Sequence, residues 1–563
     1  MEIFIFIFPL LNFLLFQFFN HKIRTKFLYS LSIFLFALTF VLSLYIFFKI
    51  LNLDKDLPLF FYPLIKFNNL FIDWTLRFDL LVSVLIILVT FTGLLLIIYS
   101  INTSQNHSIN FQINSHISLS IFSVLILISS NNVIQFYLGW YLVIMSTYLI
   151  FNFSKNKIDN SNIFIQNRVS DLCFFLSLHF VYNFSNSINF DVIFKSIQIF
   201  EDNINIFNQT FNSFDIVIFT LFFSFLLRCR QFYISNSRYD LLNLNTSSYS
   251  LILYGLYLPL GLYFMLRFGA LTQISLDYLK VLLLLGCIFT FIFSFLLILS
   301  YNLKRLIIYI ASAQFGILLI AIGLKFYSSV IFLLFTSTIS LLILSLSFGI
   351  ISSKLENEQD IRKMGNLIIK CPFMFLFILI GFVSLLGIPY FSGFYSNQLI
   401  FFQLSLINIE SYFLIFTYCF LHSFVISYIS FKIILIVFLG QNNCNIHLYN
   451  KIDEGSYYVT LILFVLSVFT IFSGWYFNNL FSSNFGQNLW RLVLVGDINF
   501  SINHSLDNNQ WFFETRYIVC YFGIFLAFLN YLIIPKLGNN LKLKNNKLFK
   551  YYLKSFTSYN FNR

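Results

Sequence analysis

The stretch GFVSLLGIPYFSGFYSNQLIF, residues 381–401, interrupts an apolar run with residues that disfavour a continuous helix. Pro389 removes one backbone hydrogen bond, and Gly387 and Gly393 loosen the turns on either side of it. Inside a bilayer, the freed carbonyls must be satisfied by protein or by water in a cavity. Broken helices of this kind recur in proteins that move ions. A simple proline kink is the alternative, and this stretch alone does not separate the two.

The rest of the chain is far more apolar than a soluble protein. Its 563 residues are 59% hydrophobic and 10% charged, and 80 of them are phenylalanine. Soluble domains are about half apolar and a quarter charged, so lipid is the expected solvent. We identify about fifteen apolar runs between residues 3 and 535 that are long enough to span a bilayer, and they are too uniform for β-barrel strands. The sequence therefore predicts an all-α polytopic membrane protein.

The charged residues lie mainly between these runs. When alternate loops are assigned to opposite sides, one side receives most of the 34 basic residues, which identifies it as the matrix or cytoplasmic side. The loop ENEQDIRKMGNL (356–367) and the basic tail 536–563 both fall on that side. The net charge of +12 therefore indicates membrane orientation, and no nucleic-acid partner is expected. A basic tail also suits anionic phospholipid such as cardiolipin.

Neither processing nor a metal site is indicated. The N-terminus, MEIFIFIFPLLNFLLFQFF, lacks a basic n-region and a small-residue cleavage site, so the first span is expected to stay in the mature protein. The seven cysteines are scattered and never form CxxC, which argues against iron–sulfur and zinc sites. Heavy use of phenylalanine and asparagine suggests an A+T-rich organelle genome.

Four segments match the motifs of one known family, in the family's order. The loop 356–367 and the broken helix after it resemble an E-Q-D-I-R-K-M-G loop followed by a G-x-P-x-x-x-G-F helix. The other three segments are SNNVIQFYLGWYLVIMSTYLIFNF (130–153), IQNRVSDLCF (165–174) and YNLKRLIIYIASAQFGILLIAIGL (301–324). The family they resemble is the antiporter-like chain 5 of respiratory complex I, the proton-pumping NADH:ubiquinone oxidoreductase.

This resemblance implies two inverted five-helix repeats within the predicted fifteen or so helices, with discontinuous seventh and twelfth helices. It divides the chain into N-terminal helices (1–113), a first repeat (114–267), a second repeat (279–440), C-terminal helices (441–535) and a matrix-side tail (536–563). It also implies a core membrane-arm subunit of the mitochondrial inner membrane, beside antiporter-like chain 4 and accessory subunits. Such a chain belongs to a proton-translocating enzyme but has no catalytic residue or cofactor, because NADH, FMN, iron–sulfur clusters and ubiquinone belong to other subunits.

The chain departs from the family where the resemblance places proton-relay side chains. The fifth-helix glutamate falls on Tyr141, within GWYLV, and the seventh-helix lysine falls on Arg228. The other relay positions that the chain has lost are Leu253, Ser337, Leu341 and Asn397. A relay needs groups that change protonation near neutral pH, which neutral side chains do not do and arginine, with a pKa above about 12, does not do readily. We therefore expect a degenerate proton path and mainly a scaffold role.

Four ionisable residues remain as candidates for a proton path. Lys432 and His422 lie on the thirteenth predicted helix, and a lysine inside the membrane is a functional candidate by default. Snorkelling of Lys432 toward the basic side is the alternative. Asp171 begins the sixth helix three residues after Arg168, where an ion pair is the alternative to a relay. Arg228 is the fourth candidate.

Two other identities remain open on the sequence alone. A stand-alone cation/proton antiporter of the same superfamily would require the carboxylates and lysines that this chain lacks. The sibling chains 4 and 2 of complex I share the predicted architecture, but the GW and EQDIRKMG motifs favour chain 5.

Overall fold

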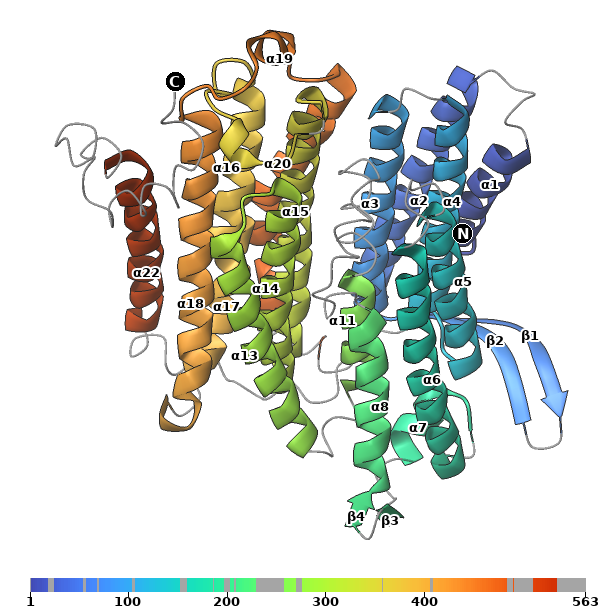
Figure 1. The fold of residues 1–563 in the computed structure, drawn as a ribbon. Coiled ribbons are helices and arrows are strands. Elements are labelled where there is room, and N and C mark those ends of the chain that lie inside the picture. Colours follow the sequence, from blue (N-terminus) through green and yellow to red (C-terminus); the bar gives the residue numbers. More distant parts are fainter. Residues whose placement is uncertain are drawn as a thin grey trace.

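The computed structural model describes residues 2–18, 25–53, 57–67, 70–103, 107–151, 159–185, 187–196, 203–206, 209–228, 258–269, 276–356, 358–405, 409–482, 490 and 510–533. Within these ranges the protein is mostly helical, and the helices run roughly side by side (Figure 1). The N-terminal half forms one group of helices and the C-terminal half a second group beside it.

The first group contains helices of 7 to 29 residues. Its helices are α1 (Phe4–Phe18), α2 (Thr25–Leu53), α3 (Leu80–Thr103), α4 (His107–Ile128), α5 (Val133–Phe151), α6 (Asp159–Ser185), α7 (Phe190–Ser196), α8 (Ser213–Arg228) and α11 (Leu258–Arg267). Buried aromatic rings from α5, α6, α8 and α11 fill its interior. Ring centroids of Phe136 and Phe264 lie 4.6 Å apart, as do those of Trp140 and Phe264. This part of the core is therefore packed with rings.

The second group is built around two central helices. Its elements are α13 (Leu276–Leu299), α14 (Leu303–Gly323), α15 (Tyr327–Lys354), the 3₁₀ turn η4 (Ile361–Lys363), α16 (Pro372–Leu386), α17 (Ser392–Ser405), α18 (Ile409–Ile433), the π-helical η5 (Ile434–Phe438), α19 (Ile446–Lys451), α20 (Tyr457–Ser482), α22 (Gln510–Phe528) and the π-helical η7 (Leu529–Ile533). The apolar windows of α14 and α15 are 100% buried, as expected for helices that are apolar on all sides. A Cβ atom at Gly286 of α13 would lie 2.8 Å from the Gly316 carbonyl oxygen of α14, so glycine permits this close packing.

Two short hairpins are a departure from the expected all-helical chain. β1 (Leu57–Phe67) pairs antiparallel with β2 (Leu70–Phe78), and β3 (Asn203–Ile206) pairs antiparallel with β4 (Gln209–Asn212). The two prolines of LPLFFYPLIKF (57–67) disfavour a helix in this segment. Pro63 falls at an irregularity in the register of the two strands, because proline cannot donate a hydrogen bond to the neighbouring strand. Uniformly apolar composition hides the two-residue alternation of a strand from sequence analysis.

The loops gather at two opposite ends of the helices, with the hairpins at one end and α19 at the other (Figure 1). At the hairpin end, buried Asp79 pairs with Arg77 of β2 and with Arg267 at the end of α11, and Arg77 also pairs with Asp191 of α7. Asp79 is 1% exposed. These ion pairs connect the β2–α3 turn, α7 and α11 into one unit, since a buried charge is stable only when it is paired.

The break predicted at Pro389 lies between α16 and α17. α16 ends at Leu386, Gly387 adopts the left-handed conformation with φ of 70°, and α17 begins at Ser392. The Gly387 amide donates back to the carbonyls of Ser384 and Val383, which satisfies part of the end of α16. The break is therefore a true interruption with two half-helices, and the simple kink is excluded.

A mostly helical membrane fold is confirmed. Among the described residues, 8 helices are long and apolar enough to cross a membrane, and further apolar helices are shorter. The total of about fifteen spans, the two inverted repeats and the five sequence divisions stay predictions. The seventh predicted helix, which the resemblance makes discontinuous, coincides with α8, and residues 229–257 after it lie outside the described part, so its discontinuity stays a prediction.

Gly393 gives a direct test of the packing at the break. A Cβ atom there would collide with the carbonyl oxygen of Ser384, which is backbone and cannot move aside cheaply. We expect Gly393→Ala to lower the free energy of unfolding by about 1–3 kcal/mol, measured by thermal unfolding of the purified protein in its membrane assembly.

Gly269→Ala is the matched control, because a Cβ atom at Gly269 meets only ordinary contacts, the nearest being Tyr327 at 3.5 Å. Equal melting temperatures for the two alanine variants would show that the two half-helices do not pack as described.

Candidate functional site

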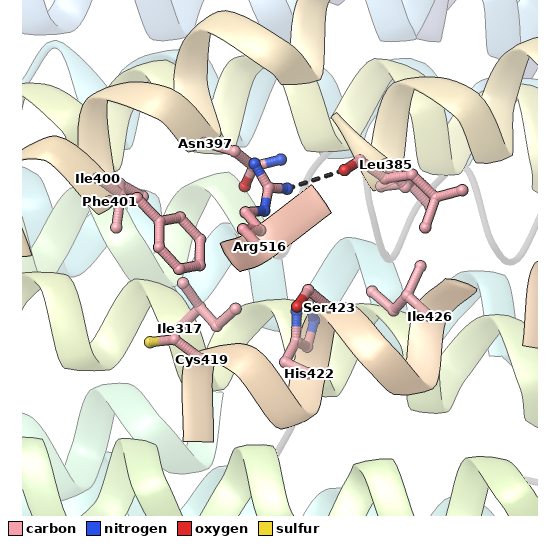
Figure 2. A pocket seen from close by; sticks show the side chains of 11 residues that line it. Ile317, Leu385, Asn397, Ile400, Phe401, Cys419, His422, Ser423, Ile426 and Arg516 are labelled. Atoms are coloured by element: carbon pink, nitrogen blue, oxygen red, sulfur yellow. Dashed lines mark hydrogen bonds between the residues drawn. The ribbon is translucent and has the colours of Figure 1, made fainter. Parts of the chain in front are cut away.

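The candidate site surrounds the break, where two small cavities meet. The first, here called the break cavity, lies between α14, α16, α17, α18 and α22 (Figure 2). Its polar side chains are Asn397, His422, Ser423 and Arg516, and the rest of its lining is apolar apart from Cys419. The space accommodates roughly one water molecule. The site is therefore nearly closed and far too small for an organic substrate.

The second cavity, here called the hydroxyl cavity, shares Asn397 and Leu385 with the first. Its other polar lining comes from Gln314, Thr336, Ser337, Ser340 and Ser384, all of them buried. The Thr336 and Ser396 hydroxyls lie 2.8 Å apart and form a hydrogen bond between α15 and α17. This cavity is polar, but none of its lining side chains carries a charge at neutral pH.

Three of the sequence-predicted relay positions belong to the described residues of the second group of helices. Ser337 and Asn397 line the hydroxyl cavity, whereas Leu341 is fully buried and apolar. Ser337 donates its hydroxyl to the Leu334 carbonyl of its own helix. Of the relay positions, the structure thus brings Ser337 and Asn397 together beside the break, and both side chains are neutral.

Lys432 does not reach either cavity. Its ammonium group donates to the carbonyls of Ile298 and Ser300, each at 3.1 Å, and lies 4.0 Å from the centroid of the Tyr301 ring. These carbonyls belong to the carboxyl end of α13, where a cation is favourable. The contacts are those of a helix cap close to the loop end of the bundle, and a proton-path role for Lys432 stays a prediction.

Asp171 lies in the first group of helices, away from the break. Its carboxylate accepts a hydrogen bond from the Trp140 indole at 3.0 Å and one from Arg168 at 3.5 Å. The Arg168 guanidinium also lies 5.9 Å from the ring of Tyr141, which is half-buried. The motifs GWY and NRVSD therefore form one contact between α5 and α6. Arg228 closes α8, and neither its side chain nor Leu253 belongs to the described part.

The charged loop 356–367 is anchored to the neighbouring helix ends. Asn302 caps α14 and also donates to Gln359 at 3.1 Å, and the Ile361 amide donates to the Tyr301 carbonyl. The Arg362 guanidinium lies 4.6 Å from the centroid of the Tyr301 ring, the same ring that Lys432 approaches. Neutral hydrogen bonds and the contact of Arg362 with Tyr301 therefore hold this loop against the start of α14, whereas its ion pairs are internal to the loop.

The side chain that sequence analysis missed is Arg516. It lies on α22, is 4% exposed, and its guanidinium donates to the Leu386 carbonyl at 2.8 Å. Figure 2 shows the guanidinium beside Asn397. The only signal in the sequence was a cation at the start of an apolar run, which resembles an ordinary flanking charge.

Asp360 provides a test of the loop anchor. It accepts hydrogen bonds from the Arg362 amide and guanidinium at 2.6–3.1 Å. Burial raises the pKa of this carboxyl, but these bonds outweigh burial and hold the pKa below its ordinary value. The stabilisation is therefore present at neutral pH and is lost as pH falls through the lowered pKa. We expect Asp360→Asn to destabilise the loop by about 1–2 kcal/mol and to speed amide hydrogen exchange across residues 358–367.

Glu358→Gln serves as its control. Glu358 pairs with Lys363 at an exposed position, where an ion pair contributes less than about 1 kcal/mol. Exchange rates that rise equally in both variants would contradict the anchoring role of Asp360.

A family model and several known sequences match this chain, and their descriptions agree with one another. The family described as NADH:quinone oxidoreductase/Mrp antiporter, TM, matches residues 130–427, which is more than half of the chain. NADH-ubiquinone oxidoreductase chain 5 of Acanthamoeba castellanii is 27% identical over 97% of this chain and 81% of its own length. The protein of that name in Chondrus crispus is 28% identical over 80% of this chain and 69% of its own length. NADH-quinone oxidoreductase subunit L of Rickettsia typhi is 28% identical over 90% and 77%.

Solved structures share the fold. A chain of the Mrp complex from a Dietzia species superposes with a TM-score of 0.75 at 14% identity, covering 98% of this chain and 58% of that chain. A chain of the membrane-bound sulfane sulfur reductase, an archaeal respiratory membrane complex, gives a TM-score of 0.70 at 13% identity, covering 88% and 98%.

Proposed function

The chain belongs to the NADH:quinone oxidoreductase/Mrp antiporter transmembrane family, and we propose that it is a divergent chain 5 of respiratory complex I in the mitochondrial inner membrane. The observation that supports this most strongly is that relatives named chain 5 align along 80–97% of the chain. The chain is thus a multi-pass membrane-arm subunit of a proton-translocating enzyme. The redox cofactors belong to other subunits. The stand-alone antiporter and the sibling chains 4 and 2 are not favoured.

We infer that this subunit acts mainly as a scaffold. Around the break, α14, α15 and α17 present hydroxyl and amide groups, which hydrogen-bond water but do not exchange protons near neutral pH. In the first group of helices, the rings around Trp140 fill the interior. A charged side chain at the bilayer centre costs about 2.5–3.5 kcal/mol on insertion scales, so neutral replacements are the more stable outcome once transport is not selected.

The proposed partners are antiporter-like chain 4, accessory subunits and phospholipid. Large apolar side chains cover the outer faces of α20 and α22, among them Trp475, 67% exposed, and Tyr521, also 67% exposed. Contiguous apolar faces of this kind suit lipid and neighbouring membrane subunits. The basic tail 536–563, which we place in the matrix with cardiolipin as its partner, lies outside the described residues.

Lys432→Met tests the scaffold role. Complex I purified through a tag on this chain should contain NADH-oxidising partners, and after reconstitution in vesicles it should pump the same number of protons per electron pair as the unaltered complex. The substitution removes a donor from the Ile298 and Ser300 carbonyls, so a stability loss of about 1–3 kcal/mol is expected.

A lower proton stoichiometry in a fully assembled Lys432→Met complex would contradict the scaffold role. Purification of the chain as a monomer with cation/proton exchange activity would instead favour the stand-alone antiporter.

A further inference from the structure

Arg516 is a buried cation without a carboxylate partner in the described part of the chain. The buried carboxylates there are Asp79 and Asp171, and both lie in the first group of helices. An unpaired buried charge is unfavourable, so its persistence requires another source of stabilisation.

The stabilisation comes from the end of α16. The guanidinium donates to the carbonyl of Leu386, the last residue of that half-helix, where the helix dipole places partial negative charge. The ring of Phe401 on α17 lies 4.9 Å from the guanidinium carbon and adds a cation–π contact. Arg516 therefore satisfies one of the carbonyls that the break sets free.

Arg516 and Asn397 converge on the same point. A Cβ atom at Gly387 would lie 2.9 Å from the Arg516 Nη2 atom and 3.0 Å from the Asn397 Nδ2 atom. Glycine at this position thus serves both the left-handed turn and the approach of these two side chains. Asn397 is the α17 side chain that faces the charge, and it is neutral.

The break cavity leaves no space for a counter-ion. The Nε atom of Arg516 and the Nε2 atom of His422 have no hydrogen-bond partner among the described residues, and both side chains line a space for roughly one water molecule. A water molecule can satisfy these two atoms, but the space is too small for a hydrated anion. A second positive charge in this cavity would therefore remain uncompensated.

We propose that Arg516 is a positioning residue that closes the break with a permanent positive charge, and that the break cavity accepts only one such charge. The charge binds the carboxyl end of α16 and holds α22 against α17 and α18. On the α18 side, the Phe424 and Phe522 rings lie 6.0 Å apart and complete the attachment. This assignment does not depend on whether the chain moves protons.

A charge-exchange cycle in the intact complex tests the proposal. Arg516→Met removes the charge, Asn397→Lys adds one, and the double variant moves it from α22 to α17. We expect each single variant to lower the amount of assembled, NADH-oxidising complex several-fold, and the double variant to recover most of that loss, because neighbouring charges couple strongly. Assembly is measured by in-gel NADH oxidation after native electrophoresis.

Lys26→Met, at an exposed position on α2, is the control and should assemble normally. A purely steric role for Arg516 predicts additive losses in the double variant, and that result would overturn the proposal. Normal assembly of either Asn397→Lys or Arg516→Met alone would also overturn it. If Arg516→Met yields no complex at all, rescue by Asn397→Lys still decides the question. This experiment measures assembly and therefore tests only the role of Arg516. The scaffold role is tested separately by the proton stoichiometry of the Lys432→Met complex.

Discussion

The structure depends on how the backbone groups at the helix break are satisfied. α16 ends at Leu386 in an apolar interior, where each unsatisfied carbonyl costs several kcal/mol. The Gly387 amide turns back onto α16, and Arg516 reaches across from α22 to the Leu386 carbonyl. The interruption at Pro389 thus determines where the last described helix docks and why a charged side chain is retained in the interior.

Two other buried cations of the described part follow the same physical rule. Lys432 caps the carboxyl end of α13, and Arg267 pairs with Asp79. In each case the positive charge meets a helix end or a carboxylate within hydrogen-bond distance. Hydroxyl and amide groups line the hydroxyl cavity in the second group of helices, and aromatic rings fill the interior of the first group. A bundle with this distribution keeps the architecture of its ion-moving relatives, which is the basis of the proposed scaffold role.

Hydropathy was sufficient to predict the membrane fold, and Pro389 with its flanking glycines located an irregularity in an apolar helix, because both depend on local sequence. The residues alone did not separate a kink from a break, and the structure does. The hairpin β1–β2 was missed, since strand alternation cannot be recognised where nearly every residue is apolar. Arg516 was missed for a different reason: its partner, the Leu386 carbonyl, is 130 positions away, and only tertiary structure brings them together. Sequence analysis placed Lys432 inside a helix, as the structure does. It could not identify the carbonyls to which Lys432 donates, because they belong to the end of another helix.

The proposed scaffold role requires that the chain retain the shape of an ion-moving bundle without a continuous file of protonatable groups. Ordered water in a high-resolution map of the assembled complex tests it most directly. The scaffold role predicts isolated waters at the break cavity and the hydroxyl cavity, separated from both membrane faces by apolar side chains. An unbroken chain of water and titratable side chains from one face to the other through this subunit would contradict it.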